Sequence, residues 1–365
     1  MMPPSLSQLV ATEVLWRETL DTPAVVIDLD VVERNLQRGA AFAARSGLDF
    51  RPHIKTHKIP AIGHAQLEFG AKGITAQKVS EAEVMANAGI TDILVSYNIV
   101  GTTKLRRLAD LHARTTLRTV ADSPEIVAGL AGQFRDAGRR LGVLVEIDGY
   151  MERCGAVSVD RAMQVVEAIL QADGLRFDGF MVYPAPGQWE DALAFLSDCA
   201  SECARQGIQV NILSSGGTPD MSEIVGDGRL TEYRAGSYIY NDRSLVERAA
   251  ITLADCALSV LTTVVSTPEP TRAVIDAGSK MLSSDLLGLK GFGLVKDHPG
   301  ADVRSLSEEH GHLSLLDGAQ LHVGQRLEIV PNHCCVVSNL VDEVTFVRGS
   351  KFVSHQPVSA RGTTR

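Results

Sequence analysis

The chain has 365 residues, of which 45% are hydrophobic and 22% are charged, and its formal net charge at pH 7 is −9. This length and composition exclude a mini-protein, a disordered chain and a collagen-like repeat, and they predict one large barrel-type domain or a domain with a smaller partner. The excess of acid argues against a general nucleic-acid surface and against a binder of anionic membranes, so we expect a small-molecule partner, no nucleic acid and no membrane.

Targeting and redox features point to one compartment. No run approaches the roughly 18 consecutive apolar residues of a membrane span. The opening residues, MMPPSLSQLVATEVLW, lack a basic stretch followed by an apolar one and do not predict a secretory signal. The six cysteines are too few and too irregularly spaced for a disulfide framework in a chain of this length. These features predict a cytoplasmic protein with reduced thiols.

The first predicted domain spans residues 22–248 and is of the α/β class. Its helical stretch 30–46 has an apolar face, and Asp30 is the expected N-cap. Short β-branched runs then alternate with amphipathic stretches, which is typical of successive βα units and a parallel sheet. A doubly wound sheet is the alternative, because boundary errors can add or remove a strand. Eight runs are predicted strands, the number that a (β/α)8 barrel needs: 49–54, 73–76, 92–96, 116–121, 142–147, 177–182, 210–214 and 231–237.

The second predicted domain, residues 249–365, is an antiparallel β domain. Its predicted strands are closely spaced and joined by turn-rich links: LSVLTTVVS, TRAVIDAG, HLSLL, RLEIVPNHCCVVSNL and EVTFVRG. The early run Pro23–Leu29 is expected to pair with this domain, since the chain before the barrel needs a partner strand.

The run RPHIKTHK at 51–58 follows the first predicted barrel strand. The C-terminal strand ends of such a barrel form its active site, so Lys55 can point into the mouth. A lysine amine among other cations, here Arg51 and Lys58, has a lowered pKa and suits a Schiff base with an aldehyde cofactor. A basic surface turn is the alternative, and composition alone favours it.

Two glycine-containing runs with hydroxyl side chains follow the last predicted barrel strands. SSGGTP at 214–219 offers backbone N–H and hydroxyl donors to an anion, and AGSY at 235–238 offers a second set. The first run lacks the lysine of a nucleotide-binding P-loop, which favours a single phosphate over a triphosphate. Each run alone is equally well explained as a turn, but phosphate sites built from the last loops of a barrel recur.

The run PNHCC at 331–335 is a candidate metal site in the β domain. If this run is a strand, His333 and Cys335 share one face and can bind one zinc ion, while Cys334 points away. Two protein ligands leave positions for water or substrate, as a catalytic metal needs. A buried strand with a core histidine and inert thiols is the alternative, which the run alone favours.

Three further residues are candidates whose single signals are weaker. Arg153 in GYMERCG can bind a carboxylate or phenolate, although an arginine after a strand is more often in a surface ion pair. Tyr183 ends a predicted strand and either faces the pocket or caps a barrel layer. The signal for Gln77 is comparably weak.

Taken in chain order, the runs RPHIKTHK, ITAQKVSEAEVM, MERCG, SSGGTP, RAGSYIYND, DAGSK, SEEHGH and PNHCC resemble those of the D-threonine aldolase and D-serine dehydratase family of pyridoxal-phosphate (PLP) enzymes. The resemblance covers residues 21–347, and RPHIKTHK together with PNHCC is its specific part. It implies fold type III, with an alanine-racemase-like barrel and a C-terminal β domain. It also implies a homodimer whose active sites lie near the subunit interface.

The same resemblance implies roles for ten residues. It assigns the PLP Schiff base to Lys55, the cofactor phosphate to Gly217, Thr218, Gly236 and Ser237, the surroundings of the ring and substrate to Gln77, Arg153 and Tyr183, and the metal to His333 and Cys335. Lys55, Arg153 and Tyr183 are the implied catalytic residues.

The implied activity is that of a lyase acting on D-3-hydroxy-α-amino acids. PLP takes up the electrons released when a bond to Cα breaks, and the metal acts on the 3-hydroxyl group. Removal of the hydroxyl proton would cleave D-threonine into glycine and acetaldehyde. Removal of the Cα proton by Lys55 would expel hydroxide and convert D-serine into pyruvate and ammonia.

Two details favour elimination of the D-serine dehydratase type. Cys335 matches the zinc-dependent dehydratase branch, whereas aldolases that use manganese or magnesium typically have an aspartate there, and a thiolate suits zinc. Aldolases often have a histidine after the tyrosine, where this chain has Pro184. Similarity of the whole chain to D-threonine aldolases keeps that activity nearly level. Two rival functions are an amino-acid racemase, which would need a second base and no metal, and a non-catalytic PLP carrier.

Overall fold

The computed structural model describes residues 5–136, 138–316 and 318–365. The β-branched runs of the first half build a curled, eight-stranded parallel sheet in the order β2-β9-β8-β7-β6-β5-β4-β3, and a bridge between His53 and Thr75 joins its two edges. The predicted strand count is confirmed. The strands are β2 (Asp49–Phe50), β3 (Ile74–Ala76), β4 (Asp92–Val95), β5 (Thr116–Ala121), β6 (Leu141–Glu146), β7 (Leu175–Met181), β8 (Ile212–Ser215) and β9 (Glu232–Tyr233).

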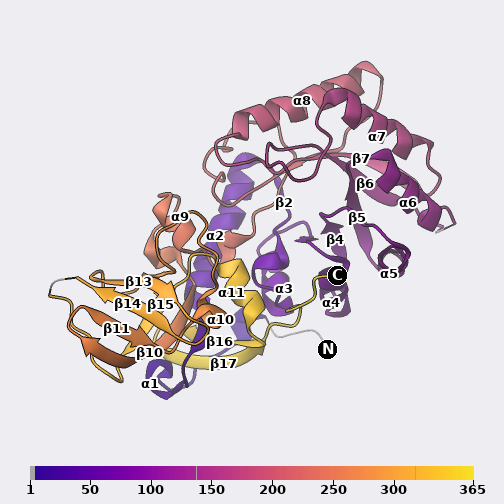
Figure 1. The fold of residues 1–365 in the computed structure, drawn as a ribbon. Helices are drawn as coiled ribbons and strands as arrows, with labels where there is room; N and C mark the ends of the chain where they lie inside the picture. Colours follow the sequence, from indigo (N-terminus) through magenta and orange to yellow (C-terminus); the bar gives the residue numbers. More distant parts are fainter. Residues whose placement is uncertain (1–4, 137, 317) are drawn as a thin grey trace.

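Helices cover the outside of this barrel (Figure 1). Their apolar faces pack on the strands, as an alternating βα pattern requires. They are α2 (Leu29–Ser46), α3 (Pro60–Glu68), α4 (Val79–Asn87), α5 (Thr102–His112), α6 (Pro124–Phe134), α7 (Val159–Gln171) and α8 (Trp189–Arg205), with α1 (Trp16–Thr19) before them and α9 (Arg243–Glu247) after them. No helix within the described ranges is long and apolar enough to cross a membrane.

Helix α2 corrects one prediction. Its N-cap is Asp28 instead of Asp30, because the Asp28 carboxylate accepts a hydrogen bond from the Asp30 N–H at 2.9 Å. The helix ends at Gly47, whose φ of +65° is a left-handed conformation that favours glycine. The predicted apolar face is largely buried and packs in the main core: Val31, Val32, Leu36 and Phe42.

The barrel interior is layered, because alternate residues of each strand point inward. The middle layer is apolar and contains Leu94, Val120, Leu144 and Met181. Below it, near the starts of the strands, lie charged side chains. Above it, beyond the strand ends, lies the cavity described below.

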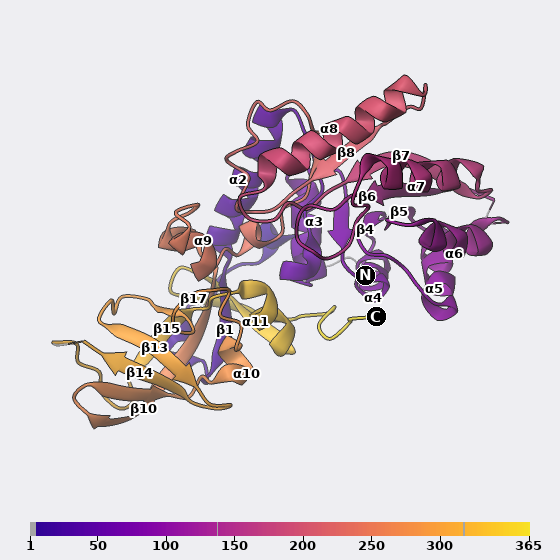
Figure 2. The same cartoon turned by 45° about the horizontal axis from the view of Figure 1, so that its top comes forward.

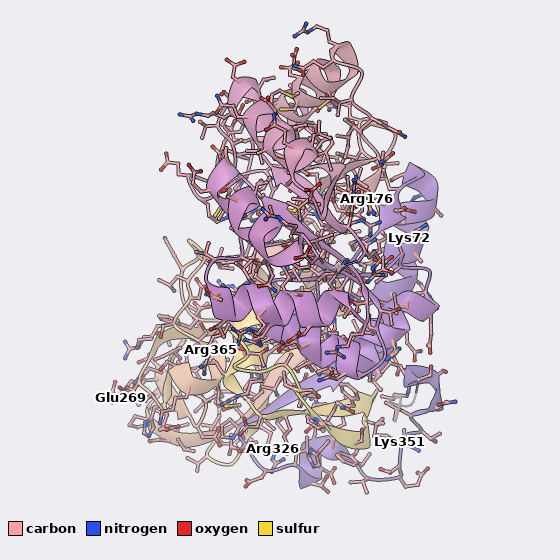
Figure 3. All side chains as sticks on the ribbon, turned by 90° about the vertical axis from the view of Figure 1, so that its right-hand side faces the viewer. Lys72, Arg176, Glu269, Arg326, Lys351 and Arg365 are labelled. Carbon is pink, nitrogen blue, oxygen red and sulfur yellow. The ribbon has the colours of Figure 1, made fainter. Side chains whose placement is uncertain are left out.

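The charged layer is an ion-pair network. Arg51 contacts Glu232 at 2.6 Å and Asp92 at 2.7 Å, and Arg118 contacts Asp178 at 3.0 Å. At the outer end of this network Lys72 and Arg176 lie close together on the barrel (Figure 3). The predicted placement of Arg51 in the mouth is therefore wrong, since its guanidinium lies at the opposite end of the barrel with two acidic partners.

The second half forms a nine-stranded sheet in the order β11-β14-β13-β12-β15-β10-β1-β16-β17, in which β10 also pairs with β11. The run predicted to join this sheet supplies β1, which pairs with β10 and β16. Figure 2 shows this sheet beside the barrel. The elements are β1 (Ala24–Asp28), β10 (Leu258–Glu269), β11 (Arg272–Ile275), α10 (Ser279–Leu282), β12 (Leu294–Val295), β13 (Ala301–Leu306), β14 (Gly311–Leu315), β15 (Arg326–Val330), α11 (Cys334–Leu340), β16 (Glu343–Arg348) and β17 (Lys351–Pro357).

The segment RLEIVPNHCCVVSNL is the clearest error in the predicted elements. The prediction is a single strand, but β15 ends before Pro331 and helix α11 follows. Pro331 lacks the N–H that a strand needs for pairing. Cys334, Val337 and Ser338 are spaced three and four residues apart and are buried together, which is a helical pattern hidden among β-branched residues.

Candidate active site

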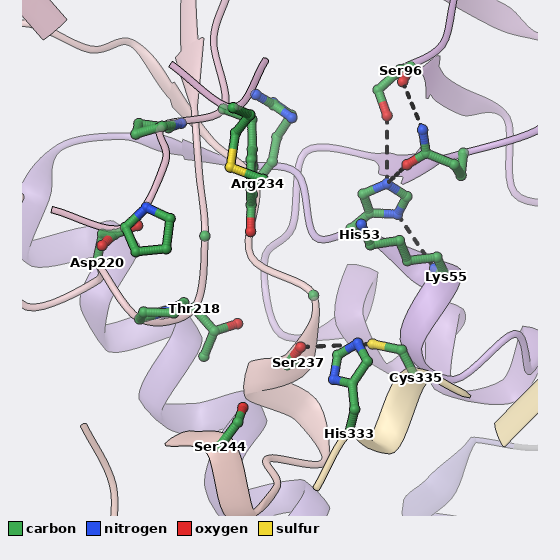
Figure 4. A pocket seen from close by; sticks show the side chains of 18 of the residues that line it. His53, Lys55, Ser96, Thr218, Asp220, Arg234, Ser237, Ser244, His333 and Cys335 are labelled. Atoms are coloured by element: carbon green, nitrogen blue, oxygen red, sulfur yellow. Dashed lines mark hydrogen bonds between the residues drawn. The ribbon is translucent and has the colours of Figure 1, made fainter. Parts of the chain in front are cut away.

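A cavity of about 360 Å³ lies at the C-terminal ends of the barrel strands, where the barrel meets the start of α11. Its wall contains side chains that follow β2, β3, β8 and β9, together with two from the start of α11 (Figure 4). All ten residues to which the sequence assigned a site role line it: Lys55, Gln77, Arg153, Tyr183, Gly217, Thr218, Gly236, Ser237, His333 and Cys335.

Lys55 lies in a 3-10 turn, η2 (Ile54–Thr56), directly after β2. His53 caps this turn, since its Nδ1 accepts a hydrogen bond from the Lys55 N–H at 3.3 Å. Burial lowers the pKa of the Lys55 amine; the Cys335 thiolate opposes this effect and Arg153 adds to it. The lowered pKa gives the amine more neutral, nucleophilic form than an ordinary lysine has.

The cations around Lys55 differ from those predicted. Lys58 is buried and its ammonium contacts Asn339 at 2.8 Å and Glu81 at 3.1 Å, so it does not face the cavity. Arg153 and Arg234 line the cavity in its place. The predicted effect on Lys55 holds, but two arginines distant in sequence contribute to it.

Gln77 is positioned by a small polar network on the Lys55 side of the cavity. Its Oε1 lies 3.0 Å from His53 Nε2, and its Nε2 donates to the Ser96 carbonyl at 3.1 Å. Burial, followed by the charge of Lys55, holds the pKa of His53 well below its usual value. The His53 ring is therefore neutral and its two nitrogens serve the Lys55 turn and Gln77.

The two glycine-containing loops form a set of free donors. Across the described residues, no protein group accepts a hydrogen bond from the N–H of Gly217, Thr218, Gly236 or Ser237. The loops are tied together because the Tyr238 N–H donates to Thr218 Oγ1 at 3.0 Å. A Cβ on Gly236 would lie 3.0 Å from Thr56 Oγ1, which keeps this loop tight against the lysine turn. Converging N–H groups of this kind fit a phosphate.

Arg153 and Tyr183 form one wall. The Arg153 guanidinium lies 5.4 Å from the Tyr183 ring centroid, in the range of a cation–π contact. Gly149 allows their loops to pack, because a Cβ there would lie 2.0 Å from the Tyr183 carbonyl oxygen. Burial and the nearby Asp220 raise the pKa of the Tyr183 hydroxyl, so it remains protonated and can donate a hydrogen bond.

Four charged residues of the wall are absent from the sequence predictions: Glu146, Asp220, Arg234 and Arg248. Arg234 is 6% exposed, and it donates to Ser214 Oγ at 2.9 Å and to the Val182 carbonyl at 2.8 Å. Glu146 ends β6, and burial raises its pKa to about 7 although Arg153 and Arg234 act in the opposite direction. For Glu146 and Arg234 a signal was present, since Glu146 lies near the end of the predicted strand 142–147 and Arg234 lies within the predicted strand 231–237.

His333 and Cys335 meet at the start of α11. His333 is the N-cap residue, and its Nδ1 lies 3.0 Å from the Oδ2 atom of the fully buried Asp242. The same oxygen accepts from the Cys334 N–H at 3.1 Å, so Asp242 fixes both the ring and the helix start. This contact leaves Nε2 of His333 as the nitrogen available to a metal, an arrangement common among histidine ligands.

The cysteines are arranged differently from the strand prediction. The possible ligand atoms of His333, Cys334 and Cys335 all lie within 4.8 Å of one another, so Cys334 does not point to an opposite face. Cys334 is fully buried and does not line the cavity. A hydrogen bond with Cys334 lowers the pKa of Cys335 well below its ordinary value; burial opposes this, and His333 and Lys55 add to it. A thiolate beside an imidazole is a donor set that fits zinc.

Comparison with known proteins places both domains. Residues 27–244 match the family model for the alanine racemase N-terminal domain, and residues 257–347 match that for a putative serine dehydratase domain. The chain is 32% identical to a D-threonine aldolase of Arthrobacter, over 95% of this chain and 94% of the relative. It is 31% identical to the D-threo-3-hydroxyaspartate dehydratase of Delftia, over 95% and 96%.

Solved structures agree with these relatives. The D-threonine aldolase of Filomicrobium marinum superimposes with a TM-score of 0.87 at 35% identity and covers 95% of this chain and 97% of its own. A D-threo-3-hydroxyaspartate dehydratase has been solved as a cysteine-to-alanine variant in a metal-free form, with a TM-score of 0.80 at 30% identity and coverage of 93% and 98%. The chain therefore belongs to the family of D-3-hydroxy amino acid aldolases and dehydratases, lyases that join an alanine racemase N-terminal domain to a serine dehydratase domain.

Proposed function

We propose that the chain is a PLP- and divalent-metal-dependent dehydratase that acts on D-3-hydroxy-α-amino acids, with D-serine as the reference substrate. D-Serine would lose ammonia to give pyruvate, with a water molecule eliminated and then regained. When bound, PLP would take up the electron pair released at Cα and the metal would supply Lewis acidity at the 3-hydroxyl.

The residues of the chain have distinct roles in this proposal. Lys55 carries the cofactor and then removes the Cα proton, for which its lowered pKa suits it. The free N–H groups of the loops at 217–218 and 236–237 hold the phosphate. Arg153 and Tyr183 orient the ring and the substrate, and His333 with Cys335 holds the metal. Gln77 positions the His53 ring through a hydrogen bond, and His53 in turn caps the Lys55 turn.

The single observation that carries elimination concerns the histidines that line the cavity. Retro-aldol cleavage needs a group that removes the 3-hydroxyl proton, whereas elimination needs one at Cα, which Lys55 provides. Among the described residues, the histidines that line the cavity are His53 and His333. His53 is engaged by Gln77 and His333 by Asp242, and Pro184 follows Tyr183 on the wall. Neither of these two imidazoles is therefore free to serve the hydroxyl.

The metal in this proposal is zinc. A thiolate and an imidazole are softer ligands than the oxygen donors that manganese and magnesium prefer. Cys335 provides the thiolate, because its lowered pKa favours the ionised form. Manganese or magnesium would be the expected metal if aspartate occupied this position.

The second candidate function is D-threonine aldolase activity. It is supported by identity to the Arthrobacter and Filomicrobium aldolases over nearly the whole chain. Cleavage of D-threonine would give glycine and acetaldehyde, and the metal would have to acidify the hydroxyl without help from a free histidine.

One experiment separates the two functions. Purified protein loaded with PLP and zinc is incubated separately with D-serine, D-threonine and D-3-hydroxyaspartate, and keto acid, ammonia, glycine and aldehyde are measured together. Elimination predicts keto acid and ammonia in equal amounts. Glycine and aldehyde as the main products would contradict the proposed function and favour the aldolase. Undiminished formation of these products in the presence of a metal chelator would contradict the metal dependence of both functions.

We further propose a cytoplasmic homodimer. Large apolar side chains lie exposed at the cavity mouth, where Met151 is 37% and Leu287 40% exposed, and a second subunit would cover them. The six free cysteines suit a reducing compartment. Light scattering of the purified protein tests the dimer, and a monomeric mass at micromolar concentration would contradict it.

A further inference from the structure

Two side-chain contacts join the lysine turn of the barrel to the metal-ligand helix of the β domain. Thr56 Oγ1 lies 3.1 Å from Cys335 Sγ, and Lys58 Nζ donates to Asn339 Oδ1 at 2.8 Å. Cys335 and Asn339 are four residues apart on α11, so they lie on one face of the helix, about one turn apart. The two contacts therefore run side by side and fix both the distance and the rotation of α11 relative to the turn.

Lys58 is held firmly for a lysine. It is 6% exposed, and its φ of +56° is uncommon for a residue with a side chain. Its N–H donates to the Ile54 carbonyl at 2.8 Å, and its own carbonyl accepts from the Ala360 N–H at 3.0 Å. The backbone thus directs the side chain inward, toward the boundary between the two domains. A lysine at such a buried position does not contribute to solubility.

The Lys58 ammonium also reaches the cofactor side of the cavity. It lies 3.1 Å from Glu81 Oε1, and Glu81 Oε2 accepts from the Gln77 N–H at 2.8 Å. Gln77 lines the cavity next to His53. One buried cation therefore links three parts of the site: the Lys55 turn, the Gln77 segment and the helix that begins with Cys334 and Cys335.

We propose that Lys58 is a positioning residue that, with Asn339, sets the separation between Lys55 and the His333–Cys335 pair. This inference rests on the proposed function, because it matters only if both groups act on one substrate. Lys58 contacts neither cofactor nor substrate in this role. Its ammonium positions α11 through Asn339, and its backbone is part of the Lys55 turn.

The sharpest test is Asn339→Leu, which removes the helix end of the link and leaves the Lys58–Glu81 pair intact. Zinc affinity is measured by competition with a chromophoric chelator, and thermal unfolding is measured on the metal-free protein. Loss of partners around a metal ligand weakens metal binding by about 10–100-fold, and we expect about tenfold here. The unfolding temperature of the metal-free protein should change little, because Lys58 keeps its ion pair with Glu81 and Asn339 itself is only partly buried.

Lys58→Met and the double variant provide the second arm. If the two residues act as one link, the double variant should bind zinc no more weakly than Lys58→Met alone, since interacting pairs are not additive. Lys296→Met is the matched control, because it removes another ammonium paired with a buried carboxylate, Glu328 at 3.0 Å, in a pair that does not line the cavity. This control should leave zinc affinity unchanged.

Four outcomes separate the possibilities. Zinc affinity within twofold of the parent in Asn339→Leu would overturn the positioning role. So would an equal loss after deletion of residues 362–365, because Gly362 N–H also donates to Asn339 Oδ1 and the tail would then be the cause. A parent protein that binds no zinc would overturn the metal site itself, and the positioning role with it. A parent that binds zinc but eliminates from no D-3-hydroxy acid contradicts only the proposed function.

Discussion

The cations at the two ends of the barrel differ in whether acidic side chains pair with them. At the starts of the strands, Arg51 and Arg118 each contact two acidic side chains. At the strand ends, Lys55 and Arg153 face a cavity and form no ion pair within the described residues. Charge that is compensated inside the chain stabilises the fold, and charge left uncompensated in a cavity is available to a ligand. Stability and function are therefore separated within one barrel.

The two ends are connected by buried hydrogen bonds. Glu232 accepts from Arg51 at 2.6 Å and from Ser214 Oγ at 2.8 Å, and Ser214 Oγ accepts from Arg234 at 2.9 Å. The compensated layer thus supports the guanidinium that lines the cavity. Gly142 makes room for this layer, because a Cβ there would lie within 2.3 Å of Asp178 Oδ2.

The largest expected effect is on function at the cavity end. Lys55→Ala removes the amine that we propose carries the cofactor and acts at Cα, so turnover should fall by about 10³-fold or more. The unfolding free energy should stay close to that of the parent, since Lys55 forms no ion pair with any described residue. Turnover and urea denaturation are measured on the same preparation. Full turnover in this variant would show that the central residue has been assigned wrongly.

The next effect is on stability at the opposite end. Arg51→Met leaves the buried Glu232 without its cation and leaves Asp92 with Arg118 alone, which should lower the free energy of unfolding by about 3 kcal/mol. Urea denaturation measures this loss, and Arg51→Lys should recover part of it. A loss under about 1 kcal/mol would mean that the network contributes little and that the two ends differ less than we argue.

Glu146→Gln tests the one cavity acid with a strongly shifted pKa. Burial raises the pKa of Glu146 from 4.5 to about 7, so between these values the folded chain holds a proton that the unfolded chain releases. The free energy of unfolding therefore falls as the pH rises through this window. Above the window the full loss is up to about 3 kcal/mol. The variant should match the parent near pH 5 and exceed it near pH 8 in urea denaturation of ligand-free protein. If the variant and the parent differed in unfolding free energy by the same amount at pH 5 and pH 8, the raised pKa of Glu146 would be contradicted.

The smallest effect is expected at an exposed pair near the compensated end. Lys72 and Asp49 are 3.8 Å apart and both side chains are more than half exposed. Lys72→Met should therefore change the unfolding free energy by less than about 0.5 kcal/mol. A larger loss would show that the whole end, and not only its buried layer, contributes to stability.

The sequence by itself determined the strand count, the two-part architecture and the common location of ten site residues. Residues just after predicted barrel strands, such as Lys55 and the two glycine-containing loops, must converge because parallel strands all end at one side of a barrel. That His333 and Cys335 of the β domain join them was implied by the resemblance to the family. The α11 prediction failed because β-branched composition outweighed a helical spacing in so short a segment.

Only the tertiary structure decided which charges are free. Arg51 and Lys58 belong to one basic run, yet the fold gives each a carboxylate partner: Arg51 pairs with Glu232, 181 residues away, and Lys58 pairs with Glu81. Lys58 also donates a hydrogen bond to Asn339, 281 residues away. Asp242 behind His333 and Arg234 beside the cavity are likewise defined by contacts across the fold. Local pattern sets where a strand ends, but the pairing of a buried charge depends on which distant side chain the packed fold brings within hydrogen-bonding distance.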